Sequence, residues 1–194
     1  MRANLMRELT RELTQERFDV TDSGLYFPRQ SVGVSGEYFG RVNGGTWEKE
    51  GNNLIVAEGL SHILNVALGA KAKATGYYLA LFSGAAAPAD NWTAANFAQA
   101  ASELISQTEG YTAATRPQWE PADTSNMAID NLATVASVTF ATAASVNVTG
   151  AALLTSSVRG GTTGVLVSAS KYAATRTFQD GDTYDIGYRL TLSA

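Results

Sequence analysis

The stretch ATVASVTFAT, residues Ala133–Thr142, decides the fold class. Its apolar residues Val135, Val138 and Phe140 are separated by small and polar residues. Such alternation is typical of a β-strand that buries one face and exposes the other. The stretch therefore predicts a half-buried strand in a sheet.

More short strands are expected on either side of this stretch, separated by turn residues. We expect them at Ser145–Thr149, Ala151–Leu154, Gly164–Ala169 and Tyr184–Leu192. The turns fall at Gly150, Arg159-Gly160-Gly161-Thr162 and Asp180-Gly181-Asp182. Short strands at such regular spacing favour a β-sandwich or a jelly roll. Residues 111–194 are therefore predicted to be all-β.

The preceding segment, residues 51–110, combines strands with one convincing helix. The helix is predicted at Glu58–Leu68, with an apolar side formed by Leu60, Ile63, Leu64, Ala67 and Leu68. Short strands are expected at Asn53–Ala57 and Tyr77–Phe82, and Thr93 is suited to cap a short helix over Ala94–Ala101. We predict one mainly β domain over residues 51–194, a jelly-roll or β-sandwich body with one internal helix.

The first 17 residues, MRANLMRELTRELTQER, have the pattern of an amphipathic helix. Leu5, Leu9 and Leu13 are spaced by four residues, and Arg and Glu fill most other positions. A stripe one residue wide is too narrow to hold a lone helix in water. The segment is therefore expected to dock on its own domain or on a partner, and the alternative is a frayed tail.

Residues 18–50 are rich in glycine and are interpreted as an extended arm. Together with the helix they form a predicted N-terminal region over residues 1–50. Within it Asn43-Gly44-Gly45-Thr46 predicts a hairpin turn between Tyr38–Val42 and Thr46–Glu48. Such an arm is a candidate for strand addition to a neighbour. The candidate partner-binding residues are Leu5, Leu9, Leu13, Tyr26, Phe27, Tyr38 and Phe39.

Composition excludes several kinds of site. The 194 residues include no cysteine and one histidine, which rules out disulfides, thiol chemistry and multi-histidine metal sites. The net charge of −4 argues against a nucleic-acid partner. There is no run of about 20 apolar residues and no apolar segment near Met1, so we expect no membrane partner and synthesis in the cytoplasm.

Three groups of side chains are candidates for a catalytic or metal site. His62 lies four residues after Glu58, but a third metal ligand is missing, so a helix-surface or packed histidine is favoured. Around Gly181, Asp180, Asp182 and Asp185 have a spacing that can bind calcium, although a plain turn explains them. A glycosidase needs two paired carboxylates, and the candidates are Glu103, Glu109, Glu120 and Asp123.

The carboxylates near Arg116 have a simpler interpretation. Arg116 is expected to pair with a glutamate, while Trp119 and Tyr111 pack beneath a loop. No catalytic residue, no metal site and no cofactor is predicted. The sequence therefore favours a binding or structural protein over an enzyme.

The order of several motifs resembles a known family. These motifs are Asn52–Leu60, Tyr77–Phe82, Glu109–Tyr111, Arg116–Trp119, Asn131, Gly150–Leu154, Gly164–Ser170, Arg176 and Gly181-Asp182. In this order they resemble the capsid cement or decoration proteins of podovirus-like tailed bacteriophages, over roughly residues 50–192. Residues 1–49 have no counterpart in that pattern.

The resemblance implies a non-enzymatic virion protein on the outside of an icosahedral capsid, assembled in the host cytoplasm. It implies that the protein bridges neighbouring copies of the major capsid protein, as a dimer or trimer. The alternative is a tail or head-fibre component that binds a tail partner or a host surface glycan, with Trp92, Trp119 and Tyr111 as stacking residues. A cellular carbohydrate-binding module is a further alternative.

Overall fold

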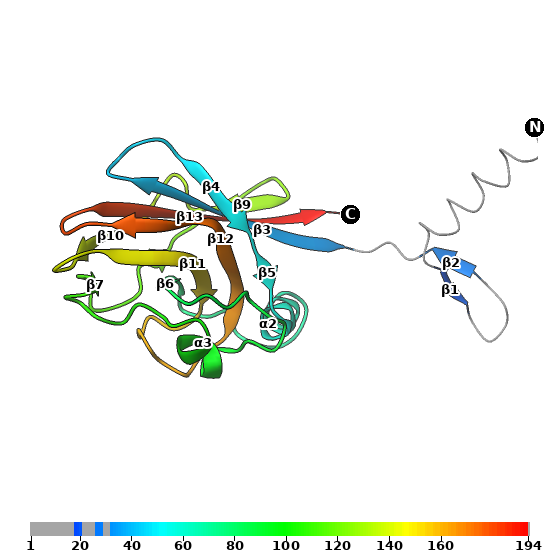
Figure 1. Cartoon of the computed structure of the whole chain (residues 1–194). Helices are drawn as coiled ribbons and strands as arrows, with labels where there is room; N and C mark the ends of the chain where they lie inside the picture. The colour runs from blue at the N-terminus through cyan, green and yellow to red at the C-terminus, as the bar shows by residue number, and fades with distance from the viewer. Residues whose placement is uncertain (1–17, 21–25, 29–31, 194) are drawn as a thin grey trace, which may run out of the picture. The chain divides into compact units, whose positions relative to one another are not determined.

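The computed structural model describes residues 18–20, 26–28 and 32–193, with side chains from residue 32 onward (Figure 1). It divides into two compact units. One comprises residues 1–33 and 192–194, and the other comprises residues 34–191. In the first unit β1 (Phe18–Val20) pairs antiparallel with β2 (Tyr26–Pro28).

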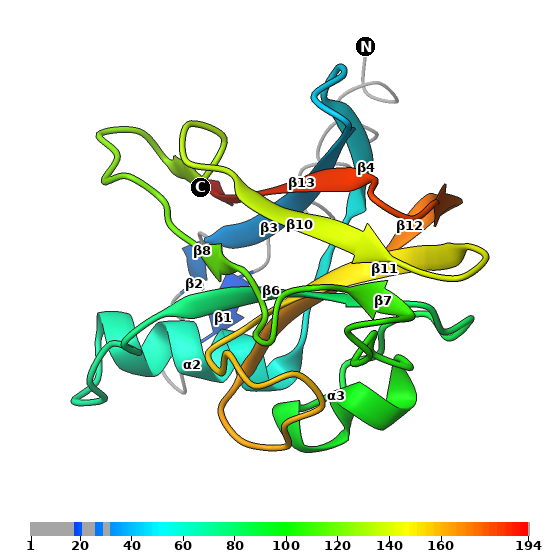
Figure 2. The same cartoon turned by 90° about the vertical axis from the view of Figure 1, so that its left-hand side faces the viewer.

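The second unit is built on two antiparallel sheets that form a sandwich-like body (Figure 2). The six-stranded sheet has the order β4 (Glu48–Asn52), β3 (Gly33–Val42), β13 (Thr183–Ser193), β10 (Ala136–Ala141), β7 (Gly110–Tyr111), and β9 (Ala128–Asp130) pairs with β13. The five-stranded sheet has the order β5 (Leu54–Ile55), β12 (Leu166–Phe178), β11 (Val146–Leu154), β6 (Tyr77–Phe82), β8 (Gln118–Trp119). The mainly β, sandwich-like fold expected from the sequence is confirmed, while its jelly-roll form stays a prediction.

The main core lies between the two sheets. On β10, Ala136, Val138 and Phe140 point inward and Ser137 and Thr139 are exposed, as the alternation in the sequence requires. The ring of Phe140 stacks on that of Phe178 with centroids 4.1 Å apart. The predicted strand is therefore confirmed, and it begins later than expected because Ala133 and Thr134 lie in a turn before it.

A second core lies on the outer side of the five-stranded sheet. Leu79 and Leu81 of β6 belong to the main core, whereas Ala80 and Phe82 pack against helix α3 (Ala94–Ala100). This double burial explains why YYLALF is apolar without alternation. The helix begins after Thr93, whose side chain takes part in a capping box with Asn96, as the sequence predicted for this cap.

Residues 33–52 belong to the six-stranded sheet rather than to an arm. The structure places the boundary between its units at residues 33–34, not at residues 50–51. Gly36 and Gly40 point inward, and a Cβ at either position would collide with the hydroxyl of Tyr188 or Tyr184. The glycines therefore make room for tyrosines of β13.

The hairpin predicted at Asn43–Thr46 is confirmed. Strands β3 and β4 pair antiparallel with Gly40 opposite Glu48. Asn43 and Gly44 both have positive φ, 49° and 67°, as a tight hairpin turn of this type requires. In the part of the chain that the structure describes, no helix is long and apolar enough to cross a membrane.

Candidate interaction surface

Helix α2 (Ala57–Ala67) has two buried residues, Gly59 facing β12 and His62 facing Tyr77 of β6. A Cβ at Gly59 would collide with the carbonyl oxygen of Val167, so the helix and strand backbones are in close contact. The Nε2 atom of His62 is hydrogen-bonded to the Tyr77 hydroxyl at 3.0 Å. These two contacts fix which side of α2 faces the body.

The other side of α2 carries three exposed leucines. Leu60, Leu64 and Leu68 are 47%, 60% and 83% exposed, and Leu68 is the residue at which the helix ends. Residues spaced by four lie on one face of a helix, so these side chains form a continuous row. We call this row the leucine stripe. A row of exposed apolar side chains of this kind is a candidate interaction site.

The face of α2 around the leucine stripe is uncharged. Its other exposed residues are Ala57, Ser61, Asn65 and Ala67. The one charged residue of the helix, Glu58, accepts hydrogen bonds at Oε2 from the backbone amides of Ala94 (2.8 Å) and Leu166 (2.7 Å). A partner that covers the leucine stripe therefore has no charge on α2 to desolvate.

The sequence predicted this helix correctly to within one residue at each end, but not which way its apolar side faces. Of the apolar residues on that side, Ile63 packs partly against the main core. It lines a pocket of about 430 Å³ together with Trp119 and Leu153. The leucines face outward because Gly59 and His62 occupy the inner side of the helix.

The predicted partner-binding residues fall into three groups. Leu5, Leu9 and Leu13 lie outside the described residues. In β2, Tyr26 and Phe27 pair with Val20 and Asp19 of β1.

The third group, Tyr38 and Phe39, lies on β3 of the body. Tyr38 does not fit the prediction, because it is fully buried and its hydroxyl is 3.0 Å from the Ser168 hydroxyl in the other sheet. Phe39 is half-buried beneath the Arg189 guanidinium, 5.6 Å from its ring centroid.

The three aromatic residues considered for glycan stacking are buried. Trp92 and Trp119 are 6% and 7% exposed, and Tyr111 is fully covered. The Trp119 indole donates to the Tyr188 carbonyl at 3.0 Å, and the Arg159 guanidinium lies 3.7 Å from the Tyr111 ring centroid. Burial raises the pKa of the Tyr111 hydroxyl to about 12. These rings stabilise the body and offer no open face to a sugar.

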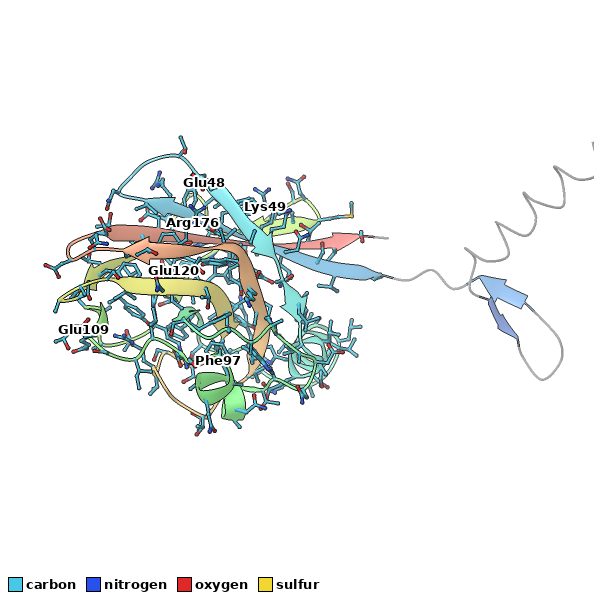
Figure 3. The ribbon with its side chains drawn as sticks, in the orientation of Figure 1. Glu48, Lys49, Phe97, Glu109, Glu120 and Arg176 are labelled. Atoms are coloured by element: carbon cyan, nitrogen blue, oxygen red, sulfur yellow. The ribbon has the colours of Figure 1, made fainter. Side chains whose placement is uncertain are left out.

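The candidate glycosidase carboxylates have separate structural roles. Glu103 pairs with Arg116, as expected, and both side chains are fully buried. Glu109 accepts hydrogen bonds from the Thr142 hydroxyl (2.7 Å) and the Ala143 amide (3.1 Å), which hold the pKa of its carboxyl below the usual value. In Figure 3, Glu109 lies at the end of the body away from α2. Glu120 and Asp123 are exposed on the segment after β8.

The three aspartates around Gly181 bind three different parts of the protein. Asp180 accepts from the Thr142 amide, Asp182 accepts from the Asn43 side chain and the Gln179 amide, and Asp185 pairs with Arg41. Among the residues described, no three His, Cys, Asp or Glu side chains gather as metal ligands. The turn interpretation of this segment accounts for all of these contacts.

Sequence reasoning did not find a buried polar cluster between β4 and β12. Glu50 is 3% exposed and accepts hydrogen bonds from Arg176 Nε and the Tyr184 hydroxyl, both at 3.0 Å. Arg176 also pairs with Glu48, and Figure 3 shows both on the facing strands. Burial raises the pKa of the Tyr184 hydroxyl. The cluster joins the two sheets. Its one signal in the sequence is Gly40, which faces inward beside the cluster.

The sequence matches no protein-family model and no curated protein.

Proposed function

We propose that this protein is a non-enzymatic structural component of a tailed-bacteriophage virion, which decorates the outside of the capsid and cements neighbouring major capsid proteins. The observation that carries the proposal is the uncharged leucine stripe on α2, a surface suited to protein assembly. The order of motifs in the sequence supports the same class of protein.

The structural contacts of side chains that could serve catalysis or metal binding support this view. Glu103, Glu109 and Asp182 each hold a loop or turn in place through hydrogen bonds within the chain. His62 anchors α2 to Tyr77. A protein that clamps its neighbours acts through buried area, and many copies on one shell act together through multivalency.

The proposed partners follow from this role. The major capsid protein is the binding partner, the protein is a homo-oligomer on the shell, and its location is the capsid exterior. A tail or head-fibre role that depends on aromatic glycan stacking has less support, because Trp92, Trp119 and Tyr111 are buried.

The decisive experiment is the copy number of this protein in purified virions. Quantitative mass spectrometry would measure it against the major capsid protein of the same particles. A cement protein should be present at a one-to-one ratio or another simple fraction of the capsid lattice. A handful of copies per particle would overturn the proposal and indicate a tail or vertex component.

A second experiment measures the cementing itself. Particles that lack this protein should release their DNA at a lower temperature than wild-type particles, and addition of the purified chain should restore the original release temperature. Equal release temperatures for the two kinds of particle would contradict a cementing role.

A further inference from the structure

Two leucine rows of the same length and spacing occur in this chain. One is the leucine stripe of α2, formed by Leu60, Leu64 and Leu68 and exposed on the body. The other is the sequence row Leu5, Leu9 and Leu13, in a segment predicted to form an amphipathic helix. None of the described residues covers the first row, and the second is too narrow to support a helix without a surface to dock on.

We propose that residues 1–17 of one copy pack as a helix on α2 of a second copy, leucine row against leucine row, and that the two copies exchange these segments reciprocally. This inference rests on the proposed function in one respect: it takes the leucine stripe to be an assembly surface. It names the occupant of that surface as another copy of this chain.

The spacing of the two rows suits direct packing. Residues four apart form the ridges through which helices most often interlock, and both rows are ridges of this kind. Because each row has three members, the central residues Leu9 and Leu64 meet whether the helices run parallel or antiparallel. The pairing therefore identifies one contact that does not depend on helix direction.

The charges of the two segments are compatible with this contact. Residues 1–17 carry Arg2, Arg7, Arg11 and Arg17 with Glu8, Glu12 and Glu16, so both signs are interspersed around the row. The exposed face of α2 is uncharged. Docking of the leucine rows therefore sets no charge of the exposed α2 face against residues 1–17, and the charged residues at the sides stay in water.

Buried area favours reciprocal exchange between copies. The exposed fractions of the three α2 leucines amount to about two fully exposed leucines, a patch of a few hundred Å². A stable interface buries about 800 Å² per partner, so a single docked segment falls short. In a closed pair each copy both gives and receives a segment, which doubles the area and leaves no stripe uncovered.

The absence of cysteine from the sequence allows a direct test. We would prepare one full-length chain with Leu9→Cys and another with Leu64→Cys, mix them and oxidise the mixture. The proposal expects a disulfide-linked dimer that contains one chain of each kind. A matched control replaces Leu9→Cys by Arg11→Cys, which lies about 200° around a helix from residue 9 and should give at least tenfold less product.

A second test places opposite charges in the two leucine rows. Sedimentation of the full-length chain would measure self-association. Leu9→Lys or Leu64→Glu alone should weaken self-association at least tenfold, because each buries an unpaired charge. A mixture of the two variants should associate more tightly than either alone. Ile105→Glu, an exposed position on another part of the body, is the control and should leave association unchanged.

Three results would overturn the inference. They are a wild-type chain that stays monomeric at micromolar concentration, cross-linking no greater than that of the Arg11→Cys control, and, in a further variant with both Leu9→Cys and Leu64→Cys, a disulfide that forms only within one chain. All these experiments use the purified chain without capsids. If these tests showed no exchange but the copy number in virions matched the capsid lattice, the segment exchange would be rejected and the proposed decoration role would be retained.

Discussion

The guanidinium of Arg116 binds the carboxylate of Glu103 through two parallel hydrogen bonds, Nε to Oε1 at 2.7 Å and an Nη atom to Oε2 at 2.8 Å, with both side chains fully buried. Arg116 also donates to the Ser156 carbonyl, and Glu103 also accepts from the Gly160 amide. One ion pair therefore fixes three loops of the body. The further hydrogen bonds of both side chains are made to backbone groups, and these bonds offset the cost of burying two charges.

Removal of one partner of this pair should strongly destabilise the protein. Arg116→Met leaves the Glu103 carboxylate buried without its cation, and we expect a loss of about 3–5 kcal/mol in the free energy of unfolding. Urea titration followed by tryptophan fluorescence would measure it. The double variant Arg116→Met/Glu103→Leu should regain much of the loss, and a single variant within about 1 kcal/mol of wild type would contradict the role assigned to the pair.

Substitution of Gly59 should destabilise the body although it favours the helix. Gly59→Ala gains about 1 kcal/mol of helix propensity, but its Cβ collides with the Val167 carbonyl and forces α2 away from β12. We expect a net loss of more than about 1 kcal/mol in thermal unfolding experiments. Ser61→Ala, on the exposed face of the same helix, is the control, and its effect should stay within about 0.5 kcal/mol. A stabilised Gly59→Ala variant would show that α2 does not need the close contact.

The turn at Asn43 should depend on its side chain as well as on its backbone. The Asn43 Oδ1 atom accepts from the Thr183 amide at 2.8 Å, and Nδ2 donates to Asp182 at 2.8 Å. Asn43→Ala loses both bonds and is strained at positive φ, so we expect a loss of about 1–2 kcal/mol. Asn43→Gly relieves the strain but does not restore the lost bonds, so its free energy of unfolding should lie between those of the wild type and the alanine variant. Equal stability of the alanine and glycine variants would argue against strain at this φ.

Acid should destabilise the protein through His62. Burial lowers the pKa of its imidazole, Lys71 adds to the effect, and Glu58 opposes it. Among the described residues Nδ1 has no hydrogen-bond partner, so a second ring proton would find no acceptor. The imidazole therefore binds a proton at higher pH in the unfolded chain than in the folded one. The free energy of unfolding keeps the full contribution of neutral His62 above about pH 6.5 and loses it as the pH falls toward the pKa of the folded state.

The test of this prediction uses the fact that the sequence has one histidine. Its imidazole signals in a proton NMR titration report the folded pKa without ambiguity, and we expect a value below that of a model peptide. His62→Gln should flatten the pH dependence of stability near neutrality. A pKa at or above about 6.5 would show that the site accepts the charged form.

Local signals in the sequence predicted most of the elements. The alternation in Ala133–Thr142, the capping residue Thr93 and the turn at Asn43-Gly44 each act within a few residues, and the structure has a strand at Ala136–Ala141, a helix after Thr93 and a turn at Asn43-Gly44. The apolar run of β6 also predicted a buried strand, although its burial on both faces depends on α3 and could not be predicted from the run alone.

Contacts between distant residues explain the differences. The glycines at residues 36 and 40 suggested an extended arm, and their real role depends on Tyr184 and Tyr188, which lie more than 140 residues later in the sequence. In α2 the side that faces the body is set by Val167 and Tyr77, so the spacing of the leucines alone could not show whether they face inward or outward. The leucine stripe was therefore visible as a pattern, but its exposure was not.

For the proposed role as a capsid cement, strand β3 has a mechanical consequence. It is hydrogen-bonded on both sides, to β4 and to β13, and it begins at Gly33, at the boundary between the two units. A force transmitted along the chain at that point loads β3 along its own axis, perpendicular to its hydrogen bonds. The strand then resists in shear, with many bonds sharing the load at once, instead of peeling away one bond at a time.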